Sequence, residues 1–73
     1  MDNPIKKFRE RKEMSKNRFA NKIGTYGAHL RIAENIGVHT PEDIICKIGL
    51  VFEEANEGKM LKEYYDWSVG EEQ

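Results

Sequence analysis

The chain has 73 residues, of which 38% are hydrophobic and 34% charged, a balance typical of one small soluble helical domain and too apolar for disorder. A single cysteine allows no internal disulfide, the apolar stretch 44–52 is too short to span a bilayer, and no apolar run follows the basic N-terminus as in a signal peptide. These features exclude a multi-domain enzyme, a membrane protein and a disulfide scaffold, and predict one cytoplasmic domain over residues 1–73.

The net charge of −1 conceals a strong asymmetry along the chain. Residues 1–31 hold nine basic and three acidic side chains, a net charge of +6, whereas residues 32–73 hold three basic and ten acidic side chains, a net charge of −7. Such an asymmetry is typical of a protein with one pole that binds a polyanion. A solvated basic helix without a ligand would give the same charges, so the pattern alone leaves both interpretations open.

The first two expected helices begin at capping residues. Asn3, with Pro4 in the first turn, predicts a surface helix up to residue 12. Ser15 is a good cap for a second short helix, which Gly24 ends. The residues expected to point inward from these two helices are Ile5, Phe8, Phe19, Ala20 and Ile23.

A third helix is expected to begin at Thr25 or Tyr26, with Leu30 and Ala33 inward, and to be followed by a loop over residues 35–40.

The fourth helix has a start signal in Thr40, Pro41 and Glu42, which supply a cap, a first-turn proline and an acidic first turn. The β-branched run over 44–52 would also suit a buried strand, but spacings of three and four favour a nearly buried helix. Its expected core residues are Ile44, Ile45, Cys46, Ile48, Val51 and Phe52. Gly58 is expected as a stop before a last amphipathic helix over about residues 59–68, frayed beyond Trp67.

Catalysis and metal binding find little support. The sequence has no Gly-rich phosphate loop, no nucleophile motif and no convincing acid pair. His29, His39 and Cys46 are spaced ten and seven residues apart, which fits none of the paired zinc spacings. We therefore expect neither an enzyme nor a metal or cofactor.

Residues 15–41 carry the most informative pattern. Two short helices hinge at a glycine, with the small Ala20 where they cross and with Leu30 and Ala33 filling the crevice behind the second helix. Over about residues 5–52 the chain resembles the lambda-repressor-like (Cro/repressor-type) helix-turn-helix family, on the pattern Ser15, Phe19-Ala20, Ile23-Gly24, Leu30, Ala33-Glu34 and Pro41. The resemblance implies a compact all-α bundle of about five short helices, with the helix-turn-helix at about residues 15–35.

The resemblance also implies roles for individual residues. It makes 15–23 the helix that positions the protein on DNA and 26–34 the recognition helix. The residues implied at the DNA are Lys16, Asn17, Arg18, Tyr26, Gly27, Ala28, His29 and Arg31, with Ile32 as a further outward candidate. Arg31 suits either guanine O6/N7 or a phosphate, Ala28 suits a thymine methyl, and His29 suits a donor to DNA as well as a helical residue with no role. Glu34 is expected to be structural, because phosphates repel a carboxylate.

The expected function is therefore a sequence-specific DNA-binding transcriptional regulator, a repressor of phage or mobile-element type. It would bind paired half-sites on double-stranded DNA as a homodimer that forms fully on the DNA. The residues expected to form the dimer patch are Leu61, Tyr64, Tyr65 and Trp67, with closure of the core as their alternative role. The alternative function is a helical protein-interaction module, resembling an antitoxin or antirepressor, that binds another regulator through its acidic C-terminal half.

Overall fold

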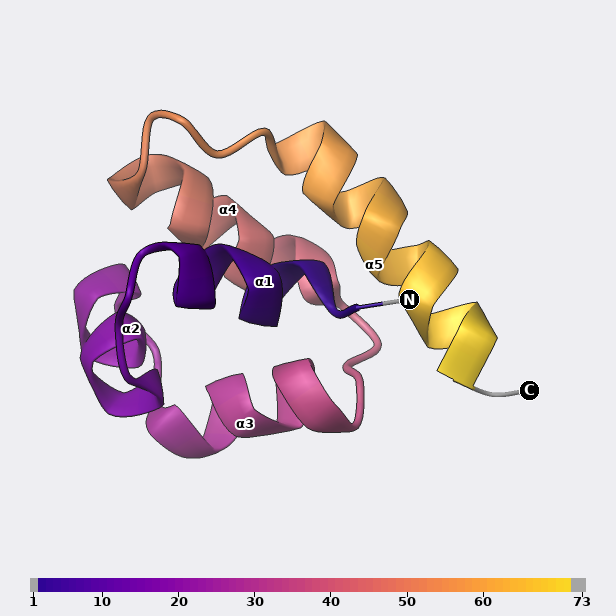
Figure 1. The fold of residues 1–73 in the computed structure, drawn as a ribbon, viewed down its shortest axis with the longest axis horizontal. Coiled ribbons are helices and arrows are strands. Elements are labelled where there is room, and N and C mark those ends of the chain that lie inside the picture. Colours follow the sequence, from indigo (N-terminus) through magenta and orange to yellow (C-terminus); the bar gives the residue numbers. More distant parts are fainter. Residues whose placement is uncertain (1, 72–73) are drawn as a thin grey trace.

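The computed structural model describes residues 2–71, and within them the chain forms five α-helices and no strand (Figure 1). The all-α fold expected from the sequence is thereby confirmed. The helices are α1 (Pro4–Arg11), α2 (Lys16–Ile23), α3 (Gly27–Asn35), α4 (Pro41–Val51) and α5 (Glu57–Glu71). No helix in this part of the chain is both long and apolar enough to cross a bilayer.

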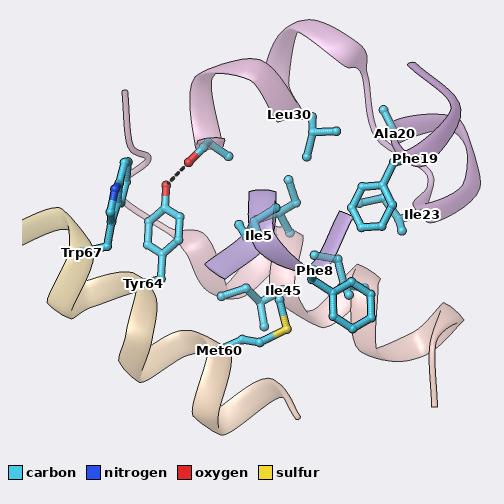
Figure 2. Close-up of a cluster of buried hydrophobic side chains, with 13 residues drawn as sticks. Ile5, Phe8, Phe19, Ala20, Ile23, Leu30, Ile45, Met60, Tyr64 and Trp67 are labelled. Atoms are coloured by element: carbon cyan, nitrogen blue, oxygen red, sulfur yellow. Dashed lines mark hydrogen bonds between the residues drawn. The ribbon is translucent and has the colours of Figure 1, made fainter. Parts of the chain in front are cut away.

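One cluster of buried apolar side chains holds the five helices together (Figure 2). All seven side chains expected to point inward from the first three helices belong to it, and α4 and α5 add Ile44, Ile45, Ile48, Met60, Tyr64 and Trp67. Phe52, just beyond α4, packs its ring against those of Phe8 and Phe19, at centroid distances of 5.3 and 5.7 Å. Because every helix contributes, each depends on the others to bury its apolar face.

The helix starts follow the expected capping signals, with one exception. The side-chain oxygen of Asn3 accepts hydrogen bonds from two backbone amides in the first turn of α1, and the Ser15 hydroxyl accepts one from the amide of Arg18. Thr40 occupies the position before α4, but its side chain makes no capping hydrogen bond. The start of α4 therefore relies on Pro41 and on acidic residues that interact favourably with the helix dipole.

The structure corrects the expectation that α4 is nearly buried. Cys46 and Val51 were placed in the core, but both are exposed. The buried face consists of Ile44, Ile45 and Ile48, and a helix turns by about 200° over the two residues from Ile44 to Cys46. Cys46 therefore lies on the opposite side of α4, and only one side of this helix belongs to the core.

The structure also corrects the start and length of the last helix. The sequence predicts a stop at Gly58 and a helix over about 59–68 with a frayed end, whereas α5 spans Glu57–Glu71 and contains this glycine. The side-chain oxygen of Asn56 accepts a hydrogen bond from the amide of Lys59 at 3.1 Å, as a helix cap does. A helix cap stabilises a helix by about 1 kcal/mol, and a glycine inside a helix destabilises it by about the same amount. The cap at Asn56 therefore offsets the cost of including Gly58, and the helix begins before this glycine.

Candidate nucleic-acid interface

A left-handed glycine sets the turn between α2 and α3. Gly24 has φ +82° and ψ +35°, a conformation that glycine adopts at less cost than a residue with a Cβ. The amide of Thr25 donates to the carbonyl oxygen of Ala20 at 2.8 Å, which satisfies the end of α2. From α4, Lys47 Nζ donates to the carbonyl oxygen of Gly24 at 3.3 Å. These bonds fix the direction in which the chain enters α3.

The N-terminal ends of α2 and α3 lie side by side. A Cβ on Gly27, the first residue of α3, would lie 2.5 Å from the side-chain oxygen of Asn17, the second residue of α2. Neither helix has an acidic residue in its first turn, whereas α4 and α5 both do. No side chain caps the start of α3. The two adjoining ends therefore combine the positive poles of two helix dipoles with backbone N–H groups, an arrangement that favours anions.

The two sides of α3 differ in burial. Leu30, Ala33 and Glu34 are buried against the rest of the protein. The exposed side chains on the other side are Ala28, Arg31, Ile32 and Asn35. Their spacings of three and four residues place them on one face, and Figure 1 shows α3 along the lower edge of the molecule with no other helix outside it. Asn35 was not expected on this face, because the sequence predicts it in the following loop, whereas it is the last residue of α3.

Four basic side chains of α2 and α3 form no ion pair with the other described residues. They are Lys16, Arg18, Lys22 and Arg31. Lys16 is half-buried and the other three are exposed. Lys12 differs from them, because it pairs with Glu54 and lies over two phenylalanine rings. The positive charge near α3 is therefore not neutralised by ion pairs within the described chain.

Two further candidates, Tyr26 and His29, lie beside the open face of α3. Tyr26 is exposed at the residue before the helix. His29 lines an open pocket together with residues of the turn and of α4, which are Thr25, Asp43, Ile44, Cys46 and Lys47. Asn17 therefore lies next to Gly27, and Ala28 lies on the same face of α3 as Arg31. His29 lies on the side of α3 that faces α4.

A buried ion pair fixes α3 against α1. Arg9 donates from Nε to Glu34 Oε2 at 2.8 Å and from Nη2 to Glu34 Oε1 at 3.1 Å, and its Nη1 donates to the carbonyl oxygen of Met14. The hydrogen bonds with Glu34 raise the pKa of Arg9, although burial opposes this rise. Glu34 is therefore structural, as expected. Arg9 was not predicted as its partner from the sequence, although Arg9 comes four residues after Ile5 and so lies on the apolar side of α1.

A second attachment holds the C-terminal end of α3. The carbonyl oxygen of Ala33 accepts a hydrogen bond from Asn3 Nδ2 at 2.9 Å. It accepts a second from the Tyr64 hydroxyl at 2.7 Å (Figure 2). The same hydroxyl accepts a hydrogen bond from the amide of Val38 at 3.0 Å. Burial raises the pKa of Tyr64 above its ordinary value, and the hydrogen bond from Val38 offsets only part of this rise. Both the first and the last helix thus contribute to the orientation of α3.

The structure does not support the full dimer patch expected on the last helix. Tyr64 and Trp67 are 1% and 4% exposed, and their rings pack together in the core at a centroid distance of 5.3 Å (Figure 2). Leu61 is partly buried against the same core, and Tyr65 is 46% exposed with its hydroxyl donating to Glu42. Tyr64 and Trp67 are therefore core residues, and only Tyr65 and part of Leu61 remain accessible to a second copy.

Comparison of the chain with protein-family models, with curated proteins and with solved structures gives no match. Among the described residues, no three side chains of His, Cys, Asp or Glu are arranged to hold a metal ion. The chemistry of the site therefore rests on two positive helix ends, several cations without an ion-pair partner and one open helix face.

Proposed function

We propose that this protein is a sequence-specific DNA-binding regulator of the helix-turn-helix class, with α3 as the helix that enters the major groove. One observation carries the proposal: the open face of α3, which bears Arg31, adjoins two helix N-termini without acidic residues. The major groove of B-DNA is about 12 Å wide and admits an α-helix. Phosphates are favourable ligands of helix N-termini. The role as a repressor of phage or mobile-element type is proposed from the sequence resemblance.

In this proposal α2 contacts the DNA backbone and α3 contacts the bases. Lys16 and Asn17, at the start of α2, bind a phosphate at the edge of the groove and so set the position of the protein. Arg18 adds positive charge on the exposed side of α2. Arg31 projects from α3 and has the paired N–H donors that fit guanine O6 and N7. The buried ion pair of Arg9 and the bonds to Ala33 keep α3 in a fixed orientation while it does so.

Two copies of the chain bind together at paired half-sites. One α3 reads only a few base pairs, and helix-turn-helix proteins commonly gain specificity by placing two modules about 34–36 Å apart on the duplex. Tyr65 and Leu61 are the residues of the expected patch that a second copy could still contact. Because this accessible part is small, we propose that the dimer forms on the DNA.

The chain is expected to bind mixed duplex DNA at low salt and to lose affinity steeply as salt rises. About three to five phosphate contacts per protomer would give a slope of log K against log salt of about −2.7 to −4.5 for each protomer, because each contact contributes about −0.9. Fluorescence titration of a labelled duplex at several salt concentrations measures the slope, and sedimentation of the complex should find two protomers per duplex. A slope near zero, or no binding at low salt, would overturn the proposal.

Single substitutions should distinguish residues that contact phosphates from residues that contact bases. Lys16→Ala is expected to weaken binding to all duplexes alike and to reduce the salt slope by about one unit. Arg31→Ala is expected to cost about 1–3 kcal/mol on a preferred duplex and much less on random DNA. Lys62→Ala removes the same charge from α5 and serves as the control, which should bind as the wild type does. Equal losses on preferred and random DNA would make Arg31 a phosphate contact.

One observation favours the alternative function, a module that binds another regulator. Leu50, near the end of α4, is 81% exposed, and the exposed Val51 follows it just before the acidic residues Glu53 and Glu54. Exposed apolar side chains beside like charges are common in surfaces that bind a basic, apolar partner. A chain that fails to bind duplex DNA in the salt titration would shift preference to this function.

A further inference from the structure

The open face of α3 consists of two strips with different chemistry. Ala28 and Ile32, four residues apart, form an apolar strip, and Arg31 and Asn35, also four apart, form a polar strip beside it. Ile32 is 43% exposed. The exposed surface of Ile32 does not contact the core, because the buried side of α3 is formed by Leu30, Ala33 and Glu34.

The surroundings of the apolar strip indicate what could cover it. Ala28 is small and exposed, so the backbone at the start of α3 can approach a ligand closely there, whereas the space beside Gly27 is filled by Asn17 of α2. Arg31 lies beside the strip, and the positive ends of two helices adjoin the start of α3. Even with the exposed Ile36, four residues after Ile32, the strip offers far less area than a stable protein interface needs. A polyanion with a small apolar group fits this combination better than an apolar protein surface.

Thymine is the base that supplies such a group. In the major groove, the C5 methyl group of thymine is the apolar feature that distinguishes its base pair, whereas the other base edges present hydrogen-bond donors and acceptors. We infer that Ile32, together with Ala28, reads thymine through contact with this methyl group. The inference rests on the proposed function and adds to it the class of base that α3 recognises beside the base or phosphate bound by Arg31.

The test uses duplexes that differ by one methyl group. A preferred duplex is selected from random-sequence DNA, and its thymines are replaced one at a time by deoxyuridine, which lacks only the C5 methyl. The wild-type chain is expected to bind about threefold to fivefold more weakly when the contacted thymine is replaced, the effect of one methyl group losing its apolar contact. Ile32→Ala keeps only the contact of Ala28 and should discriminate much less than the wild type, and Ile32→Val should discriminate by an intermediate factor.

The matched control is Leu50→Ala, which truncates a still more exposed apolar side chain on α4 and should keep the full discrimination. Circular dichroism establishes that each variant is folded. The inference is overturned if Ile32→Ala discriminates as the wild type does, if the wild type binds both duplexes equally, or if selection yields no preferred duplex. In the first two cases the proposed sequence-specific binding would still stand, whereas in the third only salt-dependent binding without sequence preference would remain. Absence of any duplex binding by the wild type would overturn the proposed function, and the inference with it.

Discussion

Arg9→Met is expected to lower the free energy of unfolding by about 3–5 kcal/mol, because it leaves the carboxylate of Glu34 buried without its partner. The Glu34 side chain is 0% exposed, and both of its oxygens accept hydrogen bonds from Arg9. The whole stability of a small domain is about 5–15 kcal/mol, so this loss would be a large share of it. Urea denaturation followed by far-UV circular dichroism measures the change.

Two further variants identify the cause of that loss. Arg9→Met combined with Glu34→Leu removes both charges and is expected to recover much of the stability, because no unpaired charge stays buried. Arg9→Lys keeps the charge but not the two-pronged hydrogen bonding, and should fall between the wild type and Arg9→Met. An unchanged denaturation midpoint for Arg9→Met would show that the ion pair does not hold α3 in place.

Trp67→Ala is expected to lower the free energy of unfolding by about 3–5 kcal/mol, as the loss of a buried aromatic side chain does. The Trp67 ring packs against Tyr64, and a Cβ placed on Gly37 would lie 3.7 Å from it. Truncation would therefore leave a cavity where α5 meets the segment after α3. Urea denaturation is again the measurement. A Trp67→Ala chain as stable as the wild type would contradict the assignment of this ring to the core.

Tyr65→Ala is the matched variant on the exposed side of α5. Its ring is nearly half exposed, so its removal should change the denaturation midpoint little. If Tyr65 contributes to the proposed dimer on DNA, sedimentation of Tyr65→Ala with a two-half-site duplex should show a larger share of complexes with one protomer. An unchanged proportion of two-protomer complexes would place the dimer contact elsewhere on the molecule.

The starts of the first two helices and the turn that follows could be predicted from the sequence because their determinants are local. Asn3 and Ser15 cap amides within the next three residues, and Gly24 adopts its left-handed conformation within a single turn. The inward positions followed from spacings of three and four, which place side chains on one face of a helix whatever the rest of the chain does.

The expectations that failed depended on competing or distant signals. Gly58 predicted the end of a helix, but the cap that Asn56 provides lets α5 begin before this glycine. Cys46 lies in a run so rich in apolar residues that the helical period is hard to read. The pairing of Arg9 with Glu34 joins residues 25 apart, which no local pattern specifies. Trp67 suits a core and an interface equally well, and only the packing of α5 against the rest of the chain distinguishes them.

The Ala33 carbonyl links the end of α3 to two residues that are distant in the sequence, with one donor 30 residues before it and one 31 residues after it. A ribosome releases the chain from its N-terminus, so Tyr64 emerges only after α2, α3 and α4 have been made. A nascent chain that already contains the turn at Gly24 therefore still lacks one of the bonds that orient α3. The surface proposed for DNA is therefore completed only after α5 has emerged and can pack against the earlier helices.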